Sequence, residues 1–120
     1  MLLRRSLLAL PAALAAQTPG PQSDDVQREL AQYRAEIDKL DDRIVDLLSS
    51  RAEIVRKVGN LKKRAGLPVS APGREKQVLD RVAARASRGP LPPEMVAGFY
   101  KQIMAGMSAW EASETGAKPK

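Results

Sequence analysis

The chain has 120 residues, a formal net charge of +6 at pH 7, and neither cysteine nor histidine. Without cysteine it has no disulfide, no thiol nucleophile and no cysteine-ligated metal centre. Without histidine it has no imidazole base, so Ser-His-Asp triads and histidine-containing zinc sites are excluded. Its chemistry must come from arginine, lysine, carboxylates, amides and hydroxyls.

The N-terminal residues have the pattern of an export signal. Two arginines precede an apolar run over residues 7–16, which ends in small residues. The run is short and contains Pro11, so it does not suit a bilayer span. The sequence predicts a signal peptide over residues 1–16, cleaved near Ala15-Ala16, and a periplasmic or secreted mature protein. An ordinary amphipathic helix is the alternative, and two arginines do not separate general secretory from twin-arginine export.

A long first helix is expected after a polar spacer over residues 17–23. Its apolar residues recur at alternating steps of four and three: Val26, Leu30, Tyr33, Ile37, Leu40, Ile44 and Leu47, then Ile54, Val58 and Leu61. This heptad pattern predicts one helix, about 60 Å long, that begins at Asp24 or Asp25. Because the later helices are too short to cover it, we expect an intertwined homodimer.

Proline and glycine divide the rest of the chain. A loop over residues 65–73 leads to a second helix that begins near Arg74 and ends before the Pro- and Gly-rich residues 89–93. A third helix is expected over residues 94–113. Both helices carry apolar residues at helical spacing.

No segment has the alternation of a strand. The sequence therefore predicts an all-α fold with three helices in one domain over residues 24–114, followed by a disordered polar tail over residues 115–120. The composition, rich in alanine, leucine, arginine and lysine, also favours helix.

Two cations on the first helix break its apolar pattern. Arg51 fills the heptad position between Leu47 and Ile54, where a buried guanidinium is costly unless an anion pairs with it. Lys62 follows three helical turns later on the same side. The alternative is that Arg51 pairs with a buried carboxylate in the dimer and that Lys62 extends to solvent.

Glu111 is the matching interruption in the third helix. It follows Met104 and Met107 on the apolar side, where burial favours the protonated carboxyl, which can donate a hydrogen bond. The alternative is that it reaches water near the helix end. Arg74 and Glu75 open the second helix, where backbone N–H groups attract an anion.

These residues together predict an anion-binding pocket. Arg34 lies about 25 Å along the helix from Arg51, so it can join only the pocket of an antiparallel partner subunit. The pocket then holds Arg51, Lys62, Arg74 and the partner subunit's Arg34, with one acid and no nucleophile or metal. Such a pocket fits a small dianion whose reaction needs only that the substrate is held in a folded conformation and that charge is stabilised in the transition state.

Five short motifs contain these residues and their neighbours. In the first helix they are Tyr33-Arg34-x-x-Ile37-x-x-Leu40-Asp41-x-x-Ile44-x-x-Leu47-Leu48-x-x-Arg51 and Val58-Gly59-x-x-Lys62. In the loop and later helices they are Pro68-Val69, Arg74-Glu75 and Tyr100-x-x-Ile103-Met104-x-x-Met107-x-x-x-Glu111. Over about Val26 to Glu114, the chain resembles the all-helical chorismate mutase family.

The resemblance implies an intertwined dimer that converts chorismate to prephenate by a cofactor-free Claisen rearrangement. It implies that Arg51 and the partner subunit's Arg34 bind the substrate carboxylates. Lys62 would hydrogen-bond the ether oxygen and a carboxylate. Glu75 would hold the substrate hydroxyl, and Arg74 would support the site.

The chain departs from the family pattern at three positions. Ala71 stands where the loop often has aspartate, and Met107 stands where the last helix has serine. Glu111 replaces the commoner glutamine at the ether oxygen. Because a glutamate must be protonated to donate, we expect turnover to fall as the pH rises and Glu111→Gln to flatten the profile.

A related activity fits almost as well. The loop over residues 68–74 is similar to that of isochorismate-pyruvate lyases, which share this fold, and Gly98-x-Tyr100-x-Gln102-Ile103 resembles their third helix. Those enzymes split isochorismate into salicylate and pyruvate. Because both reactions are pericyclic, charge does not separate them, and chorismate mutase is the favoured interpretation.

A non-catalytic helical binding or dimerisation module is the remote alternative. Lys62-Lys63-Arg64 can contact phosphates, but the other basic residues alternate with acids and aromatic residues are scarce, which disfavours nucleic acid. A structural coiled coil does not explain Arg51 and Glu111 at apolar positions. We therefore expect chorismate or isochorismate as ligand, with no cofactor, metal, nucleic acid or membrane span.

Overall fold

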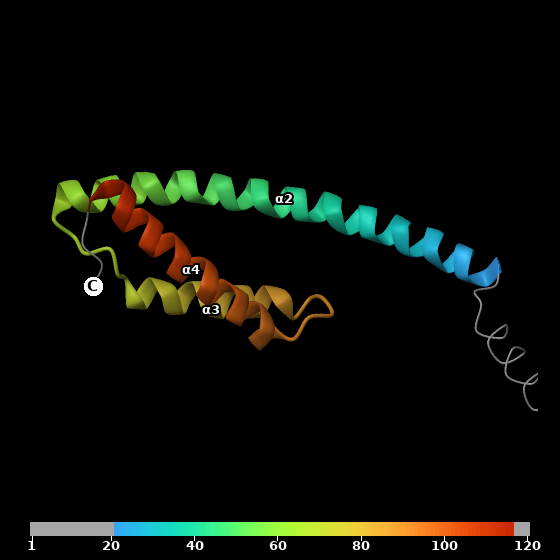
Figure 1. Cartoon of the computed structure of the whole chain (residues 1–120). Coiled ribbons are helices and arrows are strands. Elements are labelled where there is room, and N and C mark those ends of the chain that lie inside the picture. Colours follow the sequence, from blue (N-terminus) through green and yellow to red (C-terminus); the bar gives the residue numbers. More distant parts are fainter. Residues whose placement is uncertain (1–20, 117–120) are drawn as a thin grey trace, which may run out of the picture. The chain divides into compact units, whose positions relative to one another are not determined.

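The computed structural model describes residues 21–116 (Figure 1). Over these residues it contains three α-helices and no strand: α2 (Pro21–Ala65), α3 (Pro72–Ala86) and α4 (Pro93–Thr115). The all-α prediction with a long first helix is confirmed. The expected signal peptide over residues 1–16 lies outside the described residues.

The helix boundaries differ from the expected ones by a few residues. α2 begins at Pro21, so the last part of the expected spacer is helical. Proline suits the first turn, because an N–H there has no intrahelical partner. α4 continues to Thr115, which is buried, and Gly116 then adopts a left-handed φ of 72° that ends the helix. Assigning Thr115 to a disordered tail was therefore wrong.

The chain divides into two compact units, residues 1–45 and residues 46–120. In the first unit most heptad residues of α2 are solvent-exposed, and Leu30 is half-buried. Val26, Tyr33, Ile37, Leu40 and Ile44 are each 52–54% exposed. A continuous apolar stripe of this length is normally covered by another surface. None of the helices within residues 21–116 combines the length and apolar character needed to cross a bilayer.

In the second unit, α3 and α4 pack against each other. Val78 and Val82, one turn apart on α3, are buried together with Ala112 of α4 and Val69 of the preceding loop. These side chains are small, and no large side chain of the described residues is fully buried. The core of this unit is therefore limited, and side-chain contacts between α2 and α4 add to it.

Arg56 makes several of those contacts. Its guanidinium pairs with Glu114 of α4 at 2.9 Å and with Glu53 of α2 at 3.1 Å. The same group lies 5.2 Å from the centre of the Trp110 ring, which is within cation–π range. Arg56 therefore links the C-terminal part of α2 to Trp110 and Glu114 of α4.

Candidate active site

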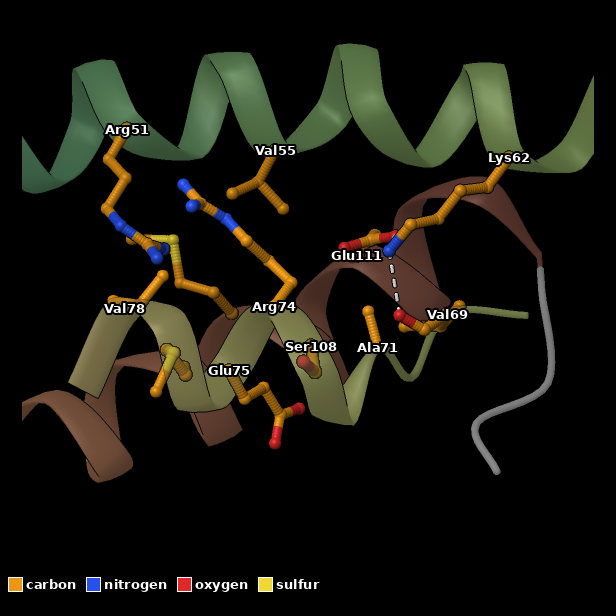
Figure 2. Close-up of a pocket in the computed structure, with 12 residues that line it drawn as sticks. Arg51, Val55, Lys62, Val69, Ala71, Arg74, Glu75, Val78, Ser108 and Glu111 are labelled. Carbon is orange, nitrogen blue, oxygen red and sulfur yellow. Dashed lines mark hydrogen bonds and ion pairs between the residues drawn. The ribbon is translucent and has the colours of Figure 1, made fainter. Parts of the chain in front are cut away.

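A cavity of about 110 Å³ in the second unit gathers the predicted site residues of one subunit (Figure 2). α2, the following loop, α3 and α4 all contribute to it. Its lining residues are Arg51, Val55, Lys62, Val69, Ala71, Arg74, Glu75, Val78, Met104, Met107, Ser108 and Glu111. Five predicted residues, from three helices, thus line one cavity: Arg51, Lys62, Arg74, Glu75 and Glu111.

Lys62 is directed into the site. Its Nζ donates a hydrogen bond to the backbone oxygen of Val69 at 2.7 Å and lies 3.4 Å from Oε2 of Glu111 (Figure 2). Its side chain is 20% exposed. The alternative that Lys62 extends to solvent is therefore wrong. The loop carbonyl fixes where the ammonium sits, a contact that nothing in the sequence pattern indicated.

Glu111 is buried, with a side chain only 6% exposed. The alternative that it reaches water near the helix end is wrong. Its carboxyl oxygen Oε2 lies 3.4 Å from the ammonium of Lys62, so the acid and the cation occupy the same end of the cavity.

Arg51 and Arg74 approach the cavity from α2 and α3 and point into the space between these helices (Figure 2). Within residues 21–116, no carboxylate lies within ion-pair distance of either guanidinium. The two guanidinium groups repel each other, and an anion bound between them would offset this repulsion. A second cavity, of about 280 Å³, is lined by Arg51, Ile54, Val55, Val58, Arg74 and Glu111. The unpaired cations thus face space that an anion can fill.

Glu75 lies in the first turn of α3 and lines two cavities. One is the 110 Å³ cavity, and the other, of about 400 Å³, also includes Ser70, Lys101 and Ser108. In the view of Figure 2 its carboxylate is directed away from Arg51 and the other α2 side chains. Glu75 therefore borders both cavities.

Besides Glu111, the other two departures expected from the resemblance also lie at the cavity. Ala71 and Met107 both line it, so apolar side chains stand at the two positions where the resemblance implies polar ones. Ser108, which the sequence analysis missed, lines it as well. Its position could have been found from helical spacing, because Met104, Ser108 and Glu111 follow one another at steps of four and three.

Arg34 belongs to the first unit. It lies on α2 and is exposed. Its predicted role depends on a partner subunit. As to metal binding, residues 21–116 contain no cluster of three acidic, histidine or cysteine side chains arranged to hold an ion.

Comparison with known proteins gives consistent results. The sequence profile of the family described as chorismate mutase type II matches residues 33–112. The chain is 30% identical over 86 residues to a bifunctional chorismate mutase/prephenate dehydratase of Aquifex aeolicus, an alignment that covers 69% of this chain and 24% of that protein. It is 36% identical over 76 residues to the T-protein of Enterobacter agglomerans, an alignment that covers 63% of this chain and 20% of that protein. It is 33% identical over 81 residues to a 4-amino-4-deoxychorismate mutase of Streptomyces venezuelae, and this alignment covers 68% of this chain and 79% of that protein.

The chain thus spans about a quarter or less of the first two relatives and most of the third. The matched residues extend from Tyr33 to Ala112 and include all six predicted site residues, from Arg34 to Glu111. The profile covers well over half of the chain, and the cationic cavity lies within it. The protein belongs to the chorismate mutase type II family.

Proposed function

We propose that the protein is an isomerase, a chorismate mutase that rearranges chorismate to prephenate. The observation that carries this proposal is the convergence of Arg51, Arg74 and Lys62 on one cavity beside the buried Glu111. Neither arginine has an ion-pair partner within residues 21–116. A small dianion supplies the missing negative charge, and family membership supports this substrate.

Binding and folding of the substrate are the first part of the mechanism. Arg51 and the partner subunit's Arg34 bind the two carboxylates, and Arg74 supports this charge arrangement. Holding both ends brings the two reacting carbons together, which removes much of the entropic barrier. The ether C–O bond then breaks as the new C–C bond forms. No atom enters or leaves, so the reaction needs no cofactor.

Charge stabilisation is the second part. As the C–O bond breaks, the ether oxygen gains negative charge, and a positioned donor stabilises the transition state more than the ground state. Lys62 supplies this donor, and its contact with the Val69 oxygen holds it in place before substrate binds. Protonated Glu111 supplies a second hydrogen bond to the same oxygen. Glu75 accepts a hydrogen bond from the substrate hydroxyl.

We also propose that the active form is an intertwined homodimer. The half-exposed heptad stripe of α2 supports this, because it needs a cover. Arg34 is exposed on the same helix and is available to a partner. Each pocket then combines Arg51 and Lys62 of one subunit with Arg34 of the other.

Two other substrates of the same size deserve direct comparison. Isochorismate is suggested by the lyase-like loop, whose Ala71 lines the cavity. The Streptomyces venezuelae relative is named for 4-amino-4-deoxychorismate, in which an amino group replaces the hydroxyl. A carboxylate such as Glu75 can accept from a hydroxyl or pair with an ammonium.

The test is turnover by the purified protein without its first 16 residues. Chorismate is supplied first, and its loss and the appearance of prephenate are followed. The two alternatives are then supplied at the same concentration, with salicylate and pyruvate as the products expected from isochorismate. We expect the highest kcat/KM for chorismate. Faster turnover of isochorismate would identify a lyase, and no turnover of any of the three would leave a binding or dimerisation module.

Export remains part of the proposal. The basic and then apolar N-terminal sequence supports a signal peptide over residues 1–16 and a periplasmic or secreted enzyme. Expression of the full chain followed by mass spectrometry of the periplasmic fraction tests it. We expect a mature N-terminus next to Ala15-Ala16, and an intact chain confined to the cytoplasm would contradict export.

A further inference from the structure

We infer that Gly59 is a positioning residue for Glu111, an inference that rests on the proposed function. Gly59 lies on α2 and is buried. A Cβ atom added at Gly59 would lie 2.7 Å from Cγ and 3.3 Å from Cδ of Glu111, and 2.9 Å from Cγ2 of Thr115. Real Cβ atoms do not approach other atoms as closely as 2.7 or 2.9 Å, so a neighbouring group would have to move. Only glycine leaves room for the Glu111 side chain as it lies.

Backbone conformation does not explain this glycine. The described glycines with a positive φ are Gly66 and Gly116, whereas Gly59 is within a regular helix. A helical glycine is less favourable than alanine, so its presence needs another reason. Gly106, in the middle of α4, gives a contrast, because a Cβ there would meet nothing within 4 Å in the subunit. The reason at Gly59 is the closeness of α4.

The contact joins two pairs of residues that are each one helical turn apart. On α2, Gly59 is followed by Lys62, and on α4, Glu111 is followed by Thr115. Thr115 donates a hydrogen bond through Oγ1 to the backbone oxygen of Glu111 at 2.8 Å. The Glu111 side chain thus passes over Gly59 and ends at Lys62, with 3.4 Å between Oε2 and Nζ. Gly59 therefore sets where the carboxyl lies relative to the ammonium.

The group that Gly59 touches is the carboxyl-bearing part of Glu111 itself, not a remote part of α4. A methyl at residue 59 must either displace the Glu111 carboxyl or move α4 away from α2. Both changes separate the two donors proposed for the ether oxygen. A misplacement of about 1 Å costs on the order of a hundredfold in rate. The three atoms nearest to the added Cβ belong to Glu111 and Thr115 and not to Arg51 or Arg74, so we expect substrate binding to be disturbed less.

The first experiment compares Gly59→Ala with Gly106→Ala. Both add one methyl to a helical glycine, but only the first meets Glu111. For Gly59→Ala we expect kcat to fall by about ten- to a hundredfold, with KM changed by less than about threefold. For Gly106→Ala we expect unchanged kcat and an equal or higher melting temperature. Wild-type kcat in Gly59→Ala would overturn the inference.

The second experiment repeats Gly59→Ala in a Glu111→Ala background. There the methyl fills space that the shortened side chain has vacated. We expect no further loss of kcat and a higher melting temperature than that of Glu111→Ala alone. In the wild-type background the same methyl should lower the melting temperature. Such non-additivity is the mark of a direct contact. Equal losses in both backgrounds would show that Gly59 acts through general helix packing and would overturn the inference.

The two readouts separate this inference from the proposed function. If the wild-type protein turns over none of the three substrates, the proposed function fails. The melting-temperature comparison needs no turnover, so it still reports whether Gly59 makes room for Glu111. Circular dichroism of each variant verifies that the helices are retained.

Discussion

The ammonium of Lys62 lies 3.4 Å from the buried carboxylate of Glu111, although 49 residues separate the two in the sequence. The same ammonium donates to the backbone oxygen of Val69 at 2.7 Å. An ammonium carries three protons, so a third can be donated to a substrate oxygen. This geometry holds a cation ready at the cavity while keeping a buried acid beside it.

Removing Lys62 should affect both turnover and stability. In Lys62→Ala, we expect kcat to fall by about a hundredfold or more, because the main donor to the ether oxygen is lost. We also expect the free energy of unfolding to fall by about 1–3 kcal/mol, because the buried Glu111 side chain loses the ammonium with which it pairs in the substrate-free protein. Turnover and urea unfolding at pH 7 measure the two effects.

The double variant Lys62→Ala/Glu111→Gln separates them. A neutral amide needs no buried counter-charge, so stability should be largely restored while turnover stays low. The exposed neighbour Lys63→Ala is the matched control and should leave both properties unchanged. If the double variant were as unstable as Lys62→Ala, the pairing would not explain the loss.

Glu111 should give turnover a pH dependence. Only the protonated carboxyl can donate to the ether oxygen, and its fraction falls as the pH rises. We therefore expect kcat to decrease toward high pH in the wild type. Glu111→Gln donates at every pH, so its profile should be flat over the same pH range. The profiles are measured with saturating chorismate, and identical curves for the two proteins would exclude this role.

Arg51 should be needed for substrate binding. Arg51→Ala removes a charge-assisted contact to a substrate carboxylate, and we expect kcat/KM to fall by about ten- to a hundredfold or more. Arg51→Lys should recover only part, because lysine lacks the planar fork. Arg64→Ala, an exposed arginine of the same helix, is the control. Gel filtration should give the same assembly for all variants, and an active Arg51→Ala would contradict the pocket.

Subunit mixing tests whether Arg34 acts across a dimer. Arg34→Ala and Arg51→Ala homodimers should each have little activity. In a mixed dimer, one of the two pockets holds both wild-type arginines and the other holds neither. When equal amounts of the two variants are mixed, unfolded and refolded, about half of the dimers should be mixed dimers. Because each of these has one intact pocket out of two, about a quarter of wild-type activity should be restored. If Arg34 acted within its own subunit, mixing would restore nothing.

Local pattern was enough to predict the helices. The heptad spacing from Val26 to Leu61 and the prolines at 68, 72, 90, 92 and 93 are properties of neighbouring residues, and helix periodicity is a local repeat. The same pattern marked Arg51 and Glu111, because a charge at an apolar position is visible without knowing what faces it. The helix ends differed by a few residues, at Pro21, Pro72 and Thr115, where helix starts tolerant of proline and a buried threonine shift the boundary.

The sequence by itself thus determined which elements form and which charged side chains break their apolar faces. Tertiary structure alone decided what those side chains meet: the Val69 carbonyl for Lys62, Lys62 for Glu111, and the space over Gly59 for the Glu111 side chain. Such contacts depend on the distance and crossing of α2 and α4. A backbone carbonyl and a glycine give no charge or hydropathy signal in the sequence. Their contacts with Lys62 and Glu111 are therefore seen only once the helices are packed.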